Sequence, residues 1–300
     1  MNSPGCLSFA MVVVRRAASF LELIKFEHTI FALPFAYLGM LIAARGLPTA
    51  WQFVWITVAM AAARTLGMGA NRLIDQQLDA RNPRTANRPL ATGAISPRTV
   101  WIGCGFAAAI LGLAAYALGP LTWRLYPGAL LVLIAYPFTK RVTILSHFLL
   151  GATDALAPLG AWAAVRGSLF GPGDLPAWIL FFTVTFWIAG FDLIYACQDI
   201  DFDRREHLHS IPARYGAPTA LRLSAVCHAW TTLLLLMLAP VSGLGWIYFA
   251  GALVAGSLLA YEHAIVSPSD LSRLDTAFFS INGVISLTLL AATAVDLAVG

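Results

Sequence analysis

Carboxylate and amide side chains recur at helical spacing in the segment NRLIDQQLDARNPRTANRPL, residues 71–90. Asn71, Asp75 and Asp79 are four residues apart, so on an α-helix they lie on one face, one turn apart. A row of oxygen donors suits Mg²⁺, which proteins hold through a few carboxylates together with water and substrate phosphates. A solvated helix end could carry the same residues, but its like charges would repel. The spacing therefore predicts a divalent-cation site.

Arginines lie among and directly after these acids. Arg72 follows the amide, and Arg84 and Arg88 lie in the RNPRTANRPL stretch beyond the second aspartate. The planar guanidinium matches phosphate oxygens through paired hydrogen bonds. Basic residues also collect in cytoplasmic loops of membrane proteins for reasons of topology. A metal site formed by the acids, followed by a phosphate site formed by the arginines, is a more specific interpretation than topology alone. We predict that Asn71, Arg72, Arg84 and Arg88 bind substrate.

A second acidic stretch, FDLIYACQDIDFDRREHLHSIPARYG, begins at residue 191. Asp192, Tyr195, Asp199 and Asp203 stand at offsets that keep to one face of a helix. Asp192 lies at the edge of an apolar run, where an ionisable group is costly and marks a functional position. Asp201 falls off that face, and we expect it to be solvated.

The two segments contain seven of the chain's 15 acidic residues: Asp75, Asp79, Asp192, Asp199, Asp201, Asp203 and Glu206. Two facing sets of carboxylates, each able to hold Mg²⁺, would form a clamp for a diphosphate, with the metal ions neutralising the charge of the leaving group.

The composition indicates how these segments are held. The chain is 59% hydrophobic and 11% charged, with a mean hydropathy of +0.76, whereas soluble domains average roughly 45–50% apolar and about 25% charged residues. We predict an all-α, polytopic membrane protein that forms a single domain over residues 1–300, with residues 1–20 in the cytoplasm or on the membrane surface. The net charge of +4 fits a lipid bilayer with basic loops better than nucleic acid as a partner.

Nine apolar stretches are candidates for spanning helices. The fourth is short and the eighth only moderately apolar, so seven or eight spans remain possible. The stretches are 26–45, 50–71, 99–118, 124–138, 144–165, 176–198, 218–240, 244–262 and 277–299.

The basic residues predict an orientation, because most of the 19 fall on one side when the N-terminus is placed in the cytoplasm. The loops after the second and sixth spans then emerge together on the cytoplasmic face, since four spans separate them. Lys140 and Arg141 follow the fourth span on that face. They could bind the diphosphate or an acceptor carboxylate, or simply anchor the chain.

The motifs also resemble those of a known family. The first segment is similar to the NxxxDxxxD signature and RTxxRPL loop of the UbiA-type intramembrane prenyltransferases, and FDLIYACQDIDFD resembles their DxxYxxxDxxxD signature. The stretches YPFTKR, KFEHTIFALPFAY and QDIDFDRREHLHSIPARYG most resemble the 4-hydroxybenzoate polyprenyltransferase branch. The resemblance implies a bundle of about nine helices with both motifs at the cytoplasmic face of a bacterial inner membrane.

The resemblance further implies transfer of a polyprenyl group from a polyprenyl diphosphate to an aromatic acid. Carbon–oxygen cleavage would give an allylic carbocation, which the aromatic ring attacks ortho to its hydroxyl group. Asp192 and Tyr195 are predicted to serve the acceptor. The implied Mg²⁺ ligands are Asn71, Asp75, Asp79, Asp199 and Asp203, the catalytic residues are Asp75, Asp79, Asp192, Tyr195, Asp199 and Asp203, and the substrate-binding residues are Asn71, Arg72, Arg84, Arg88, Lys140 and Arg141.

The acceptor is either 4-hydroxybenzoate or a related aromatic acid of a menaquinone pathway, because no residue reports the pathway. A secondary transporter with intramembrane acids is a remote alternative, although transporters place such groups near the midplane. Arg64 lies inside the second span, and its partner cannot be named from the sequence.

Overall fold

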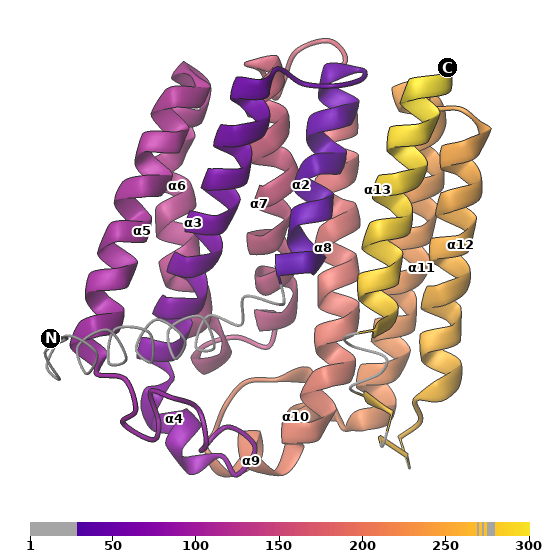
Figure 1. Cartoon of the computed structure of the whole chain (residues 1–300). Helices are drawn as coiled ribbons and strands as arrows, with labels where there is room; N and C mark the ends of the chain where they lie inside the picture. The colour runs from indigo at the N-terminus through magenta and orange to yellow at the C-terminus, as the bar shows by residue number, and fades with distance from the viewer. Residues whose placement is uncertain (1–28, 269, 272, 275–279) are drawn as a thin grey trace, which may run out of the picture.

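Nine helices of 16 to 26 residues make up the bundle seen in Figure 1, a computed structural model that describes residues 29–268, 270–271, 273–274 and 280–300. Within that part of the chain they match the nine predicted spans, and seven helical segments are long and apolar enough to cross a membrane. The predicted surface segment 1–20 lies outside the described residues. The helices are α2 (Thr29–Ala44), α3 (Ala50–Ile74), α5 (Pro97–Leu118), α6 (Pro120–Ala135), α7 (Ser146–Arg166), α8 (Leu175–Tyr195), α11 (Ala217–Ser242), α12 (Trp246–Ile265) and α13 (Asn282–Val299).

Local sequence signals set where these helices begin. Thr49 and Gln52 form a reciprocal capping box at the start of α3, which satisfies backbone N–H groups that the first turn leaves unpaired. Ser96 caps α5 just ahead of Pro97, a position that suits proline because its missing N–H would be unpaired there. Gly119 joins α5 to α6 with a φ of +130°, a conformation that favours glycine.

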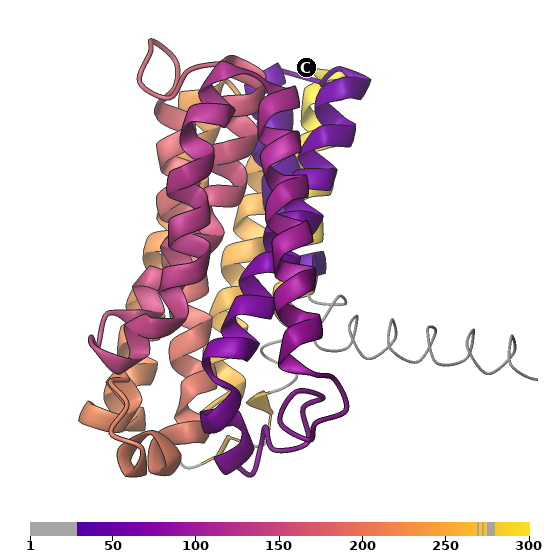
Figure 2. The ribbon, with the colours of Figure 1, turned by 90° about the vertical axis from the view of Figure 1, so that its left-hand side faces the viewer.

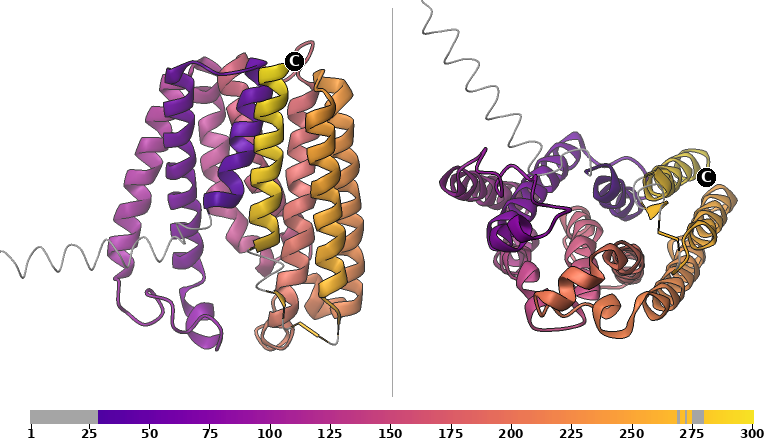
Figure 3. Two further views of the ribbon diagram at one scale, coloured as in Figure 1. Left: turned by 45° about the vertical axis from the view of Figure 1, so that its right-hand side comes forward. Right: turned by 90° about the horizontal axis from the view of Figure 1, so that it is seen from below.

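Three helices occupy the middle of the molecule. α2, α7 and α8 pack together, with α3, α5 and α6 on one side and α11, α12 and α13 on the other (Figures 1 and 3). The segment that contains α8 is the most deeply buried of the seven candidate membrane spans, because 72% of its 18-residue apolar stretch lies inside the protein. Trp187 of α8 is fully buried, and its indole N–H donates to Asn282 of α13 over 2.7 Å.

A glycine permits the close crossing of α7 and α8. At Gly151 of α7, an added Cβ would overlap the backbone carbonyl oxygen of Thr185 in α8. Small residues let the backbones of membrane helices approach closely, which increases their van der Waals contact. This crossing matters for the site because α8 leads directly into the second acidic stretch.

Among the described residues, five short helices gather at one end of the bundle, opposite the C-terminus (Figures 1 and 2). The prediction that both acidic motifs emerge at one face is thus confirmed. The short helices are α4 (Gln76–Arg81), η2 (Tyr136–Arg141), η3 (Ala196–Asp199), α9 (Ile200–Arg205) and α10 (Ile211–Tyr215).

The first motif does not form one unbroken helix, because α3 ends at Ile74 and α4 begins at Gln76. The turn between them keeps the helical register: the N–H of Asp75 donates to the carbonyl of Asn71 over 2.9 Å, and that of Asp79 to the carbonyl of Asp75 over 2.7 Å. The guanidinium of Arg141 donates to the carbonyl oxygen of Ile74 over 2.6 Å. This contact satisfies a helix-end acceptor, so it supports the break.

Candidate active site

A cavity of about 250 Å³ lies at the motif-bearing end. It is lined by all twelve residues for which the sequence predicts a role in the site. Their catalytic, substrate-binding and metal-binding roles stay predictions, but their convergence on one cavity is a property of the fold. The twelve are Asn71, Arg72, Asp75, Asp79, Arg84, Arg88, Lys140, Arg141, Asp192, Tyr195, Asp199 and Asp203.

The acids of the first motif are paired with basic side chains. Asp75 lies 2.9 Å from a guanidinium nitrogen of Arg141, and Asp79 lies 2.5 Å from one of Arg88. Arg72 is buried against the other oxygen of Asp79, at 3.8 Å. The side-chain oxygen of Asn71 accepts a hydrogen bond from Arg72, so Arg72 links Asn71 to Asp79 within the first motif.

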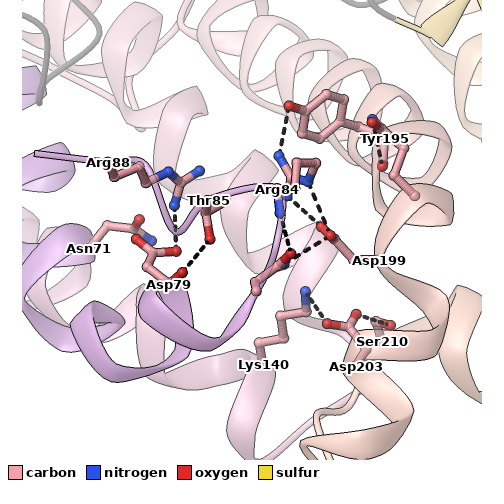
Figure 4. Close-up of polar contacts among 12 residues, drawn as sticks. Asn71, Asp79, Arg84, Thr85, Arg88, Lys140, Tyr195, Asp199, Asp203 and Ser210 are labelled. Atoms are coloured by element: carbon pink, nitrogen blue, oxygen red, sulfur yellow. Dashed lines mark hydrogen bonds and ion pairs between the residues drawn. The ribbon is translucent and has the colours of Figure 1, made fainter. Parts of the chain in front are cut away.

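The second motif is tied to the loop of the first (Figure 4). Arg84 donates to both oxygens of Asp199, over 3.1 and 2.5 Å. It also donates to the hydroxyl of Tyr195 over 3.0 Å and stacks on that ring, with its guanidinium carbon 5.0 Å from the ring centroid. The amide of Asn82 donates to Asp199 over 3.1 Å. Asn82 was not predicted, although it follows Asp79 at helical spacing.

Asp203 is the most deeply buried acid of the cavity and has no exposed surface. The ammonium group of Lys140 lies 2.9 Å from one of its oxygens, and the hydroxyl of Ser210 donates to the other over 2.7 Å. The backbone carbonyl of Lys140 accepts from the N–H of His209 over 2.7 Å. The η2 turn is therefore joined to the second motif by side chain and backbone.

The cavity contains five carboxylates and five arginine or lysine side chains, so it is close to electroneutral. Burial alone would lower the pKa of Arg84, but the hydrogen bonds and charge of Asp199 outweigh it and raise that pKa. Burial also raises the pKa of Asp75 above its ordinary value, against the opposing influence of Arg141. The basic side chains near Asp75 therefore do not fully offset the cost of burying its negative charge. A further positive charge would stabilise the ionised carboxylate.

The donor set fits Mg²⁺ in chemistry but is not a preformed metal cage. In the described part of the chain, no group of three or more His, Cys, Asp or Glu side chains is arranged to hold a metal. Mg²⁺ does not require one, since it is commonly held by one or two carboxylates together with substrate phosphates and water. The carboxylates of both motifs and the amide oxygen of Asn71 line one cavity and can supply such ligands.

Asp192 is held by a residue that the sequence did not reveal. Its Oδ2 lies 2.6 Å from Nδ1 of His147, a buried residue near the start of α7 that also lines the cavity. His147 stands in the apolar run SHFLLGA without a motif around it. No spacing signal could have linked it to an acid 45 positions further along the chain.

A second, mainly apolar cavity of about 190 Å³ adjoins the first. It runs between α3, α5, α6 and α7, and Tyr136 lines both cavities. Arg64 and Asp154 are its charged lining residues, and they interact electrostatically. The Nε atom of Arg64 is buried without a hydrogen-bond partner among the residues that the structure describes.

Residues 32–284 match the UbiA prenyltransferase family. The chain belongs to this family. Membership confirms the resemblance drawn from the two motifs, and it establishes the protein as an integral membrane prenyltransferase. Two similar UbiA relatives are named 4-hydroxybenzoate octaprenyltransferase. The one from Aeromonas salmonicida is 31% identical over 80% of this chain and 82% of its own length. The one from Saccharophagus degradans is 31% identical over 81% and 80%.

Solved structures of UbiA homologs share the fold. The apo structure from Aeropyrum pernix K1 is 34% identical, covers 90% of this chain and 98% of its own, and has a TM-score of 0.82. A homolog from Archaeoglobus fulgidus, bound to DMAPP and Mg²⁺, is 20% identical, covers 94% and 100%, and has a TM-score of 0.69. The all-helical bundle predicted from the sequence is therefore the UbiA bundle.

Proposed function

We propose that this enzyme transfers a polyprenyl group from polyprenyl diphosphate to 4-hydroxybenzoate in a Mg²⁺-dependent reaction of quinone biosynthesis. The observation that carries the proposal is the meeting of the two acidic motifs, with their basic partners, across one polar cavity that adjoins an apolar one. The relatives named 4-hydroxybenzoate octaprenyltransferase support this acceptor. A related aromatic acid of a menaquinone pathway is the alternative acceptor.

The charge balance of the polar cavity supports joint binding of diphosphate and metal. A diphosphate would attract Arg84, Arg88 and Lys140 away from the acids with which they now pair. The released carboxylates then need new cations, and Mg²⁺ supplies them. When bound, the metal ions neutralise charge on the leaving diphosphate. The residues that would hold them are Asn71, Asp75, Asp79, Asp199 and Asp203.

The apolar cavity suits the prenyl tail. Its lining excludes water, which would otherwise convert an allylic cation to an alcohol. Tyr136 stands where the two cavities adjoin, and Tyr195 lines the polar one. Aromatic faces stabilise a nearby cation, so both rings are positioned to favour cleavage of the carbon–oxygen bond, from which the diphosphate leaves with the bonding electron pair.

The acceptor fits between Asp192 and Arg64. Both residues interact electrostatically with Asp154, so the three lie in one region. Asp192 would accept a hydrogen bond from the phenol, which raises electron density at the ortho ring carbon. That carbon forms the new bond to the prenyl cation and then loses its proton to the released diphosphate or to water. Arg64, with its unpartnered Nε, would hold the carboxylate. This assignment gives Arg64 the role that the sequence could not supply.

We further propose that the site faces the cytoplasm from a bacterial inner membrane. The cluster of basic residues at the motif-bearing end supports this orientation. Labelling of single cysteines introduced at exposed positions of that end, such as Asp201, tests it in oriented vesicles. Reaction with a membrane-impermeant maleimide only after permeabilisation of right-side-out vesicles is the expected result, and equal labelling without permeabilisation would contradict it.

The acceptor is tested with purified enzyme in detergent, a prenyl diphosphate, Mg²⁺ and a panel of aromatic acids. Mass spectrometry of the products should show one prenyl group added to 4-hydroxybenzoate, and chelation of Mg²⁺ should abolish it. If only another aromatic acid were prenylated, the result would support the alternative acceptor instead of 4-hydroxybenzoate. Absence of both product and released diphosphate with every acid would contradict prenyl transfer.

A further inference from the structure

His147 makes two hydrogen bonds that hold it in one orientation. Its Nδ1 lies 2.6 Å from Oδ2 of Asp192, and its Nε2 accepts from the backbone N–H of Ile211, at the start of α10, over 3.4 Å. The ring is 2% exposed. One imidazole therefore joins α7, the end of α8 and the segment that follows the second acidic motif.

These contacts define which nitrogen carries the proton. A backbone N–H can only donate, so Nε2 of His147 must present its lone pair to Ile211. The single proton of the neutral ring then resides on Nδ1 and is donated to the carboxylate of Asp192. Both nitrogens are occupied, and taking up a second proton would break the bond to Ile211.

The bond to His147 also orients Asp192 within the cavity. In the described region, Oδ2 of Asp192 accepts from His147, while no protein hydrogen bond is recorded to Oδ1. The Asp192 side chain is 26% exposed and lines the polar cavity. One carboxylate oxygen is therefore fixed by the protein and the other remains for a ligand.

We infer that His147 is a positioning residue for the aromatic acceptor: it donates a fixed hydrogen bond that orients Asp192 toward the phenol. This inference rests on the proposed function, in which Asp192 serves the acceptor. A proton relay, with His147 taking a proton from Asp192 during the reaction, is the competing role, and the occupied Nε2 argues against it. A third possibility is that His147 only supports α10 through Ile211.

Two substitutions separate these roles because each keeps one of the two hydrogen bonds. In His147→Asn, the side-chain amide nitrogen takes the place of Nδ1 and can still donate to Asp192, while the acceptor for Ile211 is lost. In His147→Gln, the longer side chain places its amide near the position of Nε2, which preserves an acceptor for Ile211 and removes the donor to Asp192. Elution as a single peak in size-exclusion chromatography establishes that each variant is folded.

The readout is the KM for the aromatic acceptor, measured beside the KM for the prenyl diphosphate. For His147→Gln we expect the acceptor KM to rise about tenfold or more, because a hydrogen bond to a charged group is lost. The prenyl diphosphate KM should stay within about twofold of wild type. His147→Asn should retain an acceptor KM within about threefold of wild type.

A double-mutant cycle completes the test. If His147 acts through Asp192, then His147→Gln should change the acceptor KM by less than about twofold in an Asp192→Ala background. Loss of function in His147→Asn equal to that in His147→Gln would favour the relay and overturn the inference. A larger defect in His147→Asn would favour support of α10 and overturn it as well. Wild-type enzyme without any prenylated product would overturn the proposed function together with this inference, whereas the variant patterns overturn the inference alone.

Discussion

Removal of one motif carboxylate leaves a basic side chain unpaired and, in the proposed mechanism, removes a metal ligand. We expect Asp75→Asn and Asp199→Asn each to lower turnover by about 100-fold or more, since electrostatic groups that act on a leaving group contribute on this scale. Asp201→Asn is the matched control, because Asp201 lies in the same stretch as Asp199 but is exposed and outside the cavity. Steady-state rates at saturating Mg²⁺ provide the measurement. Wild-type rates in either motif variant would contradict the metal role.

Individual residues of the site differ in whether the sequence alone could predict their position. Helical spacing predicted that Asp192, Tyr195, Asp199 and Asp203 would lie together, and all four line the polar cavity. This prediction was possible because helical periodicity depends only on neighbouring residues. The bond from Arg84 to Asp199 joins residues 115 positions apart, and only the fold brings them together. His147 lacked even a local pattern, so its contact with Asp192 could not be anticipated.

At the scale of elements, the α7–α8 crossing can be tested with two glycines of α7. Gly151→Ala should destabilise the protein markedly, because the new methyl group would overlap the carbonyl oxygen of Thr185. At Gly160, an added Cβ meets no atom within 4 Å, so Gly160→Ala should leave the melting temperature nearly unchanged. Thermal unfolding in detergent compares the two. Equal melting temperatures for both variants would mean that α7 and α8 do not approach as closely as described.

The loop before α8 should make stability depend on pH. Burial alone would raise the pKa of Asp174, but hydrogen bonds from Ser168, Trp162 and the Gly171 N–H outweigh it and hold that pKa below its ordinary value. A lowered pKa in the folded state stabilises the protein above the unfolded-state pKa, and this contribution is lost as pH falls through the folded-state value.

Asp174→Asn should therefore lower the Tm by several degrees at pH 7, and the difference from wild type should shrink as the pH falls below about 4. Melting curves of both proteins across this range provide the measurement. A difference that stays constant with pH would show that the charge of Asp174 does not stabilise the loop.

The elements themselves could be predicted from apolar runs and from breakers such as Gly119-Pro120. The break at Asp75 could not, because it depends on Arg141, which bonds to the carbonyl of Ile74 from 67 positions away. Local periodicity predicts the helical register of Asn71, Asp75 and Asp79, and the structure preserves that register. It cannot predict that Arg141, from a distant turn, bonds to the end of the helix.

At the scale of the whole molecule, we propose that the prenyl tail occupies the apolar cavity between α3, α5, α6 and α7. Gly160 lines that space and has room for a side chain, so Gly160→Phe should fill part of it without disturbing helix packing. We expect the rate with a long prenyl diphosphate to fall more than the rate with a short one. Competition between a ten-carbon and a forty-carbon substrate measures this ratio. An unchanged ratio would place the tail elsewhere.

The proposed mechanism requires the two acidic motifs to hold divalent cations around one diphosphate. The most direct measurement is anomalous diffraction from crystals grown with Mn²⁺ in place of Mg²⁺ and a non-reactive thio-analogue of a prenyl diphosphate. We expect Mn²⁺ peaks beside Asp75 or Asp79 and beside Asp199 or Asp203, with the diphosphate between them. A bound diphosphate without Mn²⁺ at either motif, or Mn²⁺ and diphosphate outside this cavity, would contradict it.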